Sequence, residues 1–130
     1  MKKKAKMQKQ FNYKLRLAVE KGDLMSCQKI INEAKRTKEV TCDLNCQGQE
    51  QWTLLHIATN EGNYSIVKLL LENKANPNTQ SVNQRTALHI SCMRGHPSIV
   101  KILLDYHSNI DIADMDGNTP VHLCSEFGKP

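Results

Sequence analysis

The sequence has 130 residues, of which 39% are hydrophobic, 24% are charged and only 5% are aromatic. This composition excludes a collagen-like or wholly disordered chain and predicts one small fold with an aliphatic core, large enough to be stable without a metal or a disulfide. The net charge is +5, and apolar runs such as Leu69-Leu70-Leu71 are far too short to cross a membrane.

The first ten residues contain five lysines and no acidic residue, so residues 11–130 have 13 basic and 13 acidic residues. These lysines are Lys2, Lys3, Lys4, Lys6 and Lys9. We expect residues 1–10 to form a flexible basic tail that is solvated, serves nuclear import, or contacts an acidic surface such as a tubulin tail, RNA or an anionic lipid. No apolar segment follows the lysines, which excludes a secretory signal. The neutral remainder does not favour nucleic acid as a partner.

A motif repeats along the rest of the chain at a constant period, since its threonines stand at positions 53, 86 and 119. Its copies are T-L-L-H-I-A at 53–58, T-A-L-H-I-S at 86–91 and T-P-V-H-L-C at 119–124. Each copy is followed at the same distance by a glycine, namely Gly62, Gly95 and Gly128. A weaker first copy ends at Gly22, seven residues too early for this period. We assign the extra length to a longer second helix or loop that includes residues 35–39.

The copy that begins at Thr86 predicts two short helices. Threonine caps a helix N-terminus, and Gly95 can end the helix in the left-handed conformation. Pro97 suits the start of a second helix, whose apolar residues within 99–104 predict the more buried helix of the pair. The polar segment 109–118 predicts an extended hairpin. Since such short helices are marginal alone, the copies must stack on one another.

The chain resembles the ankyrin-repeat family in its period and in its motif. A side-chain amide or carboxylate also stands eight residues before each motif threonine, at Asn45, Asn78 and Asp111. The resemblance implies an all-α fold, an ankyrin-repeat solenoid of stacked helix-turn-helix pairs with β-hairpin loops. It implies a divergent repeat with an insertion at 11–45, repeats at 46–78 and 79–111, and an incomplete repeat at 112–130. We expect residues 121–127 to fray and the chain to be the N-terminal part of a longer protein.

Two kinds of position depart from the family pattern. Gln51 and Gln84 stand where the last copy has Gly117, which predicts looser or differently shaped hairpin tips. Lys74 and His107 stand where the family has a glycine after the second helix. A left-handed conformation at these two residues would cost about 1–2 kcal/mol.

The recurring histidines are expected to be structural. Equivalent positions of stacked helices lie about 8–10 Å apart, too far to share a zinc ion. The resemblance implies that each imidazole binds the motif threonine and the hairpin main chain. The structural positions are Thr53, His56, Gly62, Thr86, His89, Gly95, Thr119, His122 and Gly128. Thr53 and His56 lack an orienting acid and an oxyanion site, so we predict no enzyme, no cofactor and no metal site.

The five cysteines form neither a zinc motif nor a C-x-x-C pair; they are Cys27, Cys42, Cys46, Cys92 and Cys124. Cys42 and Cys46 are the best metal or redox candidates, but a free cysteine is more often a small buried apolar residue. The odd number favours a reducing compartment. We therefore expect a cytoplasmic protein, with a nuclear or a cytoskeletal or ciliary location as the alternatives.

The variable positions around the first helix of each copy are the candidate partner-binding residues. They precede the motif threonine or close the helix, and stacking would bring them to one concave face. They are Trp52, Asn60, Glu61, Arg85, Met93, Arg94, Asn118, Glu126 and Phe127. Tryptophan and arginine often dominate the energy of interfaces. The set predicts an aromatic anchor flanked by guanidinium groups, suited to an acidic or aromatic peptide, and none of these residues is expected to be needed for folding.

We predict a non-enzymatic protein–protein interaction scaffold that binds a protein partner on the concave face. Two alternatives stay open at this point. The chain could be the N-terminal sensor or targeting domain of a larger enzyme or channel, or a structural subunit of a cytoskeletal or ciliary assembly that is tethered by the lysines. Ankyrin folds share an architecture while their binding residues differ, so the sequence does not identify the partner.

Overall fold

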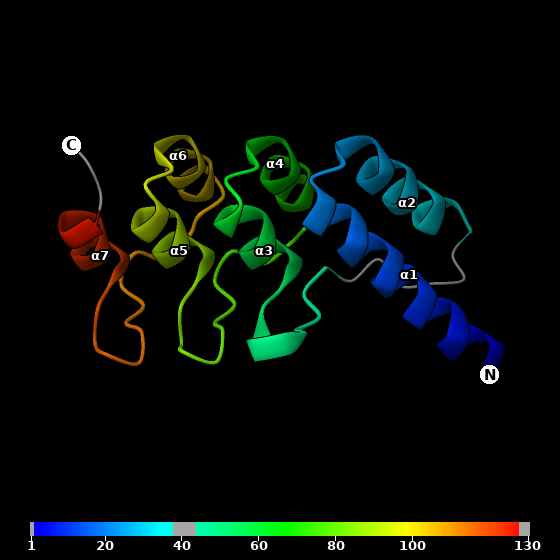
Figure 1. The fold of residues 1–130 in the computed structure, drawn as a ribbon, viewed down its shortest axis with the longest axis horizontal. Helices are drawn as coiled ribbons and strands as arrows, with labels where there is room; N and C mark the ends of the chain where they lie inside the picture. The colour runs from blue at the N-terminus through cyan, green and yellow to red at the C-terminus, as the bar shows by residue number, and fades with distance from the viewer. Residues whose placement is uncertain (1, 38–43, 128–130) are drawn as a thin grey trace. The chain divides into compact units, whose positions relative to one another are not determined.

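The computed structural model describes residues 2–37 and 44–127, with side chains from 6 to 37 and from 44 to 124. The chain divides into two compact units, Met1–Asp43 and Leu44–Pro130, which are described separately. In the described ranges all regular structure is helical, and no residue lies in a β-strand (Figure 1). This confirms the predicted all-α class.

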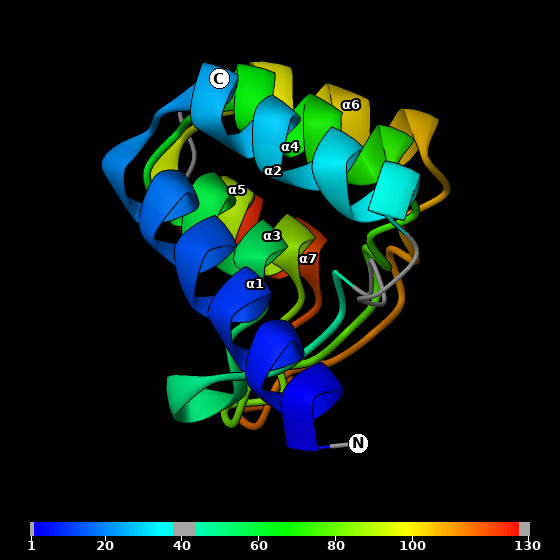
Figure 2. The same cartoon turned by 90° about the vertical axis from the view of Figure 1, so that its right-hand side faces the viewer.

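The first unit is a pair of helices, α1 (Lys2–Lys21) and α2 (Leu24–Thr37), joined by a tight turn (Figure 2). Gly22 ends α1 in the left-handed conformation, with a φ of 71°. Asp23 caps α2, because its carboxylate accepts hydrogen bonds from the Ser26 main chain and hydroxyl at 3.2 and 2.7 Å. The Ser26 hydroxyl is the main cause that lowers the pKa of Asp23. The turn therefore fixes where one helix stops and the next begins.

Residues 2–10 lie within α1, where we expected a flexible tail. Lysine, alanine, methionine and glutamine all have high helix propensity, and no glycine or proline interrupts this segment. The segment also continues a helix that is fixed by burial of Leu15 and Val19, which are 1% and 0% exposed.

Helix α2 has 14 residues against nine in α4 (Tyr64–Glu72), so part of the predicted insertion lengthens the second helix.

The second unit contains two rows of helices (Figures 1 and 2). One row is α3 (Leu54–Asn60), α5 (Ala87–Arg94) and α7 (Pro120–Phe127), and the other is α4 and α6 (Pro97–Asp105). A short 3-10 helix, η1 (Gln49–Gln51), precedes α3. The loops that lead into α3, α5 and α7 project on the same side (Figure 1).

The first helix of each pair is the more buried, contrary to our expectation. Residues 55–59 of α3 and 87–92 of α5 are all buried, whereas α6 buries three of its nine residues. The reason is position, since α5 is packed between α3 and α7 and also against α6. Gly62, in the turn after α3, approaches His96, in the turn before α6, so closely that a Cβ at Gly62 would lie 2.7 Å from the His96 ring.

The three hairpin tips close in the same way, so the expectation of differently shaped tips was wrong for the second tip. Gln51, Gln84 and Gly117 are all left-handed, with φ angles of 59°, 61° and 81°. In each copy this residue donates its N–H to the carbonyl three residues earlier, at 2.9, 2.8 and 3.0 Å. The first tip does differ at one further residue, since Glu50 is also left-handed, with a φ of 57°. Glutamine thus adopts a conformation that glycine would adopt without strain.

Main-chain hydrogen bonds between neighbouring tips explain this shared closure. The Val82 N–H donates to the Glu50 carbonyl at 3.0 Å, and one repeat later the Met115 N–H donates to the Asn83 carbonyl at 2.9 Å. The tips are therefore joined in series along the stack. A tip that closed differently would leave such main-chain groups without partners, at a cost comparable to that of a left-handed glutamine.

Lys74 and His107 are left-handed as the repeat register requires, with φ angles of 72° and 66°. We expect Lys74→Gly and His107→Gly to raise the free energy of unfolding by up to about 1 kcal/mol each, because glycine removes the steric cost of this conformation. Urea melts would measure the change. Lys68→Gly is the matched control, since Lys68 lies inside α4 and glycine there should cost about 1 kcal/mol. Destabilisation by all three substitutions would contradict the prediction.

Candidate functional site

The motif threonine and histidine form a cap that also links neighbouring repeats. His56 Nδ1 accepts a hydrogen bond from the Thr53 N–H at 3.1 Å and lies 2.8 Å from Thr53 Oγ1. On the other side of the ring, Nε2 donates to the Arg85 carbonyl at 2.9 Å. His89 repeats this arrangement with Thr86 at 3.0 Å and with the carbonyl of the next repeat at 2.9 Å. Each ring is therefore neutral, with its proton on Nε2.

His122 makes the same contact with its own threonine, at 3.2 Å from the Thr119 N–H. Its ring is exposed, whereas His56 and His89 are 1% and 0% exposed. Within the described residues no group of three histidine, cysteine or acidic side chains could hold a metal ion. The geometry of the histidines is that of helix caps and links between repeats.

Burial lowers the pKa of both His56 and His89. An unfolded histidine has a pKa of about 6.5 and binds a proton below that pH, while the folded rings resist protonation. We therefore expect the free energy of unfolding to fall below pH 6.5, by up to about 1.4 kcal/mol per pH unit for each histidine. Urea melts between pH 7.5 and 5 would measure the slope. His89→Gln should remove about half of it. A flat profile would contradict the prediction.

A shallow depression of about 90 Å³ opens between the loops and ends of α3 and α5 in the second unit. Five of the predicted partner-binding residues line it: Trp52, Asn60, Arg85, Met93 and Arg94. The other lining residues are Glu50, Ser81, Asn83 and Ile90, which the sequence patterns did not single out. Two of them, Glu50 and Asn83, occupy equivalent positions at the hairpin tips of successive copies. The repeat period could have identified this pair.

Arg85 is held in place by a buried carboxylate. Its Nε lies 3.2 Å from Asp114 Oδ2, and the Asp114 side chain is only 1% exposed. Asp114 Oδ1 also accepts hydrogen bonds from the N–H groups of Asp116 and Asn118, each at 2.9 Å. Burial by itself raises the pKa of Asp114, but the hydrogen bonds from Asn118 and Arg85 outweigh it and lower the pKa below its ordinary value. The ion pair is thus part of the fold as well as of the depression.

Arg94 is oriented in a similar way by the preceding repeat. Its Nε donates to Asn60 Oδ1 at 2.8 Å, which joins the ends of α5 and α3. In the described part of the chain both arginines are held through Nε, so their Nη groups are available to a carboxylate. A ligand would meet two guanidinium groups whose positions are already fixed.

Trp52 and Met93 form the apolar part of the depression. Both are half-buried, and the indole of Trp52 lies against the buried His56 ring, with 5.9 Å between the ring centroids.

The remaining predicted partner-binding residues with described side chains do not line this depression. Glu61 is exposed at the end of α3, outside the lining residues, and the main chain of Asn118 is used by His89 and Asp114. The side chains of Glu126 and Phe127 lie outside the described ones.

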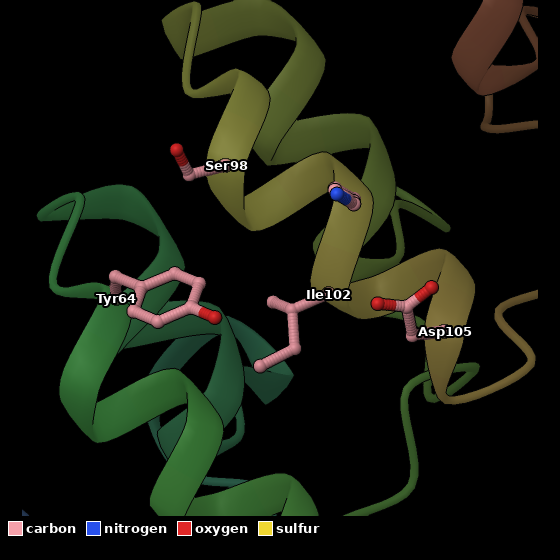
Figure 3. A pocket seen from close by; sticks show the side chains of 5 residues that line it. Tyr64, Ser98, Ile102 and Asp105 are labelled. Atoms are coloured by element: carbon pink, nitrogen blue, oxygen red, sulfur yellow. The ribbon is translucent and has the colours of Figure 1, made fainter.

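A second, open depression of about 460 Å³ lies on the other row of helices (Figure 3). Tyr64 of α4 extends towards Ile102 of α6, and Ser98, Lys101 and Asp105 complete the lining. None of the predicted site residues belongs to it. Its exposed side chains therefore supply control positions for experiments on the first depression.

Two of the cysteines form a disulfide that the sequence patterns did not predict. Cys92 of α5 and Cys124 of α7 are bonded, with 4.6 Å between their Cα atoms and a sequence separation of 32. Cys27 is buried in α2, and burial raises the pKa of its thiol to about 11. Cys46 is exposed, and Cys42 lies outside the described residues. The Cys42 and Cys46 pair therefore stays a prediction.

The fold and the site define a class of protein, a stack of short helix pairs that presents a preorganised surface at its loops. A family model described as ankyrin repeats (3 copies) matches residues 15–114 and 55–130, so the chain belongs to the ankyrin-repeat family. Ankyrin repeats generally mediate protein–protein interaction and are typically non-enzymatic. None of the curated proteins compared with the chain matches it. Among the described helices none is long and apolar enough to cross a membrane.

Proposed function

We propose that the chain is a protein interaction module and that the depression between α3 and α5 is its partner site. The observation that carries the proposal is the pair of arginines, each fixed through Nε by a residue of a neighbouring repeat. Preorganised donors lose little conformational entropy on binding. Next to them lies an aromatic ring of the type that often anchors interfaces.

The chemistry of the depression indicates the kind of segment that it would hold. Guanidinium Nη groups bind carboxylates through two parallel hydrogen bonds. Trp52 and Met93 offer an apolar contact beside them. Glu50 also lines the depression and would repel a second carboxylate near it. A peptide with one acidic side chain next to an aromatic or aliphatic one fits this arrangement.

The test starts from peptides selected on the full chain from a random displayed library. We expect Trp52→Ala and Arg94→Ala each to weaken the selected peptides by about 1–3 kcal/mol, roughly 5- to 150-fold in Kd, because each removes one contact type. The free energy of unfolding should change by less than about 1 kcal/mol. Fluorescence anisotropy and urea melts would measure the two effects.

Lys101→Ala is the matched control, since Lys101 is exposed on the other depression. It should leave Kd unchanged. Equal loss of affinity in all three variants, or none in Trp52→Ala and Arg94→Ala, would contradict the assigned site. The cytoplasmic location and the two broader roles, a sensor domain of a larger protein and a cytoskeletal or ciliary subunit, stay predictions that this experiment does not address.

A further inference from the structure

The positive charge of the chain is concentrated in the first unit, mostly in the ten residues of the lysine-rich segment. Met1–Asp43 contains 12 of the 18 basic residues and 5 of the 13 acidic ones, a net charge of +7. Leu44–Pro130 has a net charge of −2. The two units therefore differ in the partners that they would attract, and the first favours an acidic one.

A groove of about 170 Å³ lies between α1 and α2, at the end of the pair away from the turn at Gly22. Its lining residues are Met7, Gln10, Phe11 and Lys14 of α1, and Ile30, Glu33, Ala34 and Thr37 of α2. Each set has the spacing i, i+3, i+4, i+7, so each helix presents one continuous stripe to the groove. Two such stripes form the kind of surface on which a third helix can pack.

The groove has an apolar floor and a basic side. Met7 and Ile30, which are half-buried, and the buried Phe11 and Ala34 supply the floor. The basic side is formed by α1, where Lys14 lines the groove and the exposed Lys6 lies one turn before Gln10, at the edge of the same stripe. On the α2 side the charged lining residue is Glu33. A ligand with carboxylates towards α1 and none towards α2 would satisfy both sides.

We propose that this groove binds an acidic amphipathic helix of a protein partner. The apolar face of that helix would cover Met7, Phe11, Ile30 and Ala34, and its carboxylates would lie along the lysines of α1. Shape and charge thus select the same ligand, because neither an acidic helix without apolar residues nor an apolar helix without acids complements both parts of the groove.

A membrane surface or RNA fits the first unit less well. Insertion into a bilayer needs a helix whose apolar face is exposed along its length, but Phe11, Leu15, Ala18 and Val19 of α1 are at most 8% exposed. Single-stranded RNA is bound by several aromatic side chains along a basic groove. Among the described side chains of α1 one aromatic residue is exposed, Tyr13, and it is not part of the groove lining.

The experiment measures fluorescence anisotropy of two synthetic peptides with the full chain. Both are helices of about 18 residues made of leucine and glutamate; one has its leucines on a single face and the other has them distributed around the helix. We expect the amphipathic peptide to bind about 10-fold more tightly, and its affinity to fall with added salt. Equal affinities would mean that charge alone attracts the peptide, and would overturn the proposal.

Charge variants locate the binding site on the chain. Lys14→Glu should weaken the amphipathic peptide about 10-fold, and Glu33→Gln should strengthen it, since both change the groove. Lys21→Glu is the matched control, an equal change of charge at the other end of α1. Circular dichroism would verify that helicity is unchanged. Equal effects of Lys14→Glu and Lys21→Glu would overturn the proposal.

Two further results separate this site from the others. Trp52→Ala and Arg94→Ala should leave the amphipathic peptide unaffected, so this proposal and the proposed partner site of the second unit can fail independently. Anionic vesicles of phosphatidylserine and an oligouridine strand serve as competitors. If either one displaces the peptide at lower concentration than unlabelled peptide does, the groove is not the protein site that we propose.

Discussion

Reduction of the Cys92–Cys124 disulfide is expected to lower the free energy of unfolding by about 3–4 kcal/mol. The bond joins residues with a sequence separation of 32, and a closed loop of this size restricts the unfolded chain much more than the folded one. Urea melts of the oxidised and reduced chain would measure the difference. Cys92→Ser should behave as the reduced chain does.

The same bond changes what we expect of α7. From the sequence alone residues 121–127 should fray, but α7 is tethered to α5 next to its middle. Hydrogen exchange in α7 should therefore be slow in the oxidised chain and fast after reduction, while α4 and α6 stay protected in both. Cys46→Ser is the control, an exposed cysteine outside the disulfide. Identical melts and exchange in both redox states would contradict the prediction.

Arg85→Ala should destabilise the fold by about 2–3 kcal/mol, because it leaves the buried Asp114 carboxylate without its cation. From the sequence alone we expected Arg85 to be dispensable for folding, and the ion pair with Asp114 leads us to the opposite prediction. Arg94→Ala is the matched control, because Arg94 is paired with the neutral amide of Asn60. Its effect on stability should be under about 1 kcal/mol. Guanidinium chloride melts would compare the two variants, and equal stabilities would contradict the assigned role of Asp114.

The pH dependence of the Arg85 variant provides a second measurement. The pKa of Asp114 is lowered in the folded chain, so its contribution is present above the unfolded value of about 3.8 and is lost as the pH falls below it. In Arg85→Ala one of the interactions that lower this pKa is absent. The loss of stability below pH 4 should therefore be smaller in the variant than in the original chain. If the free energy of unfolding falls equally below pH 4 in both chains, Arg85 does not stabilise the charged form of Asp114.

The repeat made most of the fold predictable. The constant spacing of the motif placed α3, α5 and α7, and the family resemblance singled out Lys74 and His107 as positions where a glycine is usual, both of which are left-handed. Five of the nine candidate partner residues line one depression because the period aligns loop positions of consecutive copies. These features depend on sequence position within a copy, which a single sequence with internal repeats reveals.

Other features depend on contacts between copies, and spacing rules for single motifs do not detect them. Cys92 and Cys124 are one residue short of the period, so they occupy the seventh and sixth positions of consecutive motifs on adjacent helices. Asp114 precedes the motif and has no signature of its own, yet it fixes Arg85 of the previous copy. The helical state of residues 2–10 follows from propensity, which the high charge of the segment obscured.

The disulfide also has a mechanical consequence for a chain built of units joined in series. Under tension a repeat stack extends by releasing one repeat after another, and each residue released adds about 3.3–3.6 Å of contour length. While the bond is intact, the chain between Cys92 and Cys124, with a sequence separation of 32, cannot extend, and about 110 Å of contour length is not released. A pull on residues beyond Cys124 is transmitted directly to α5 and bypasses the loop between them. The redox state of this bond therefore sets how far the C-terminal part of the stack can be drawn out.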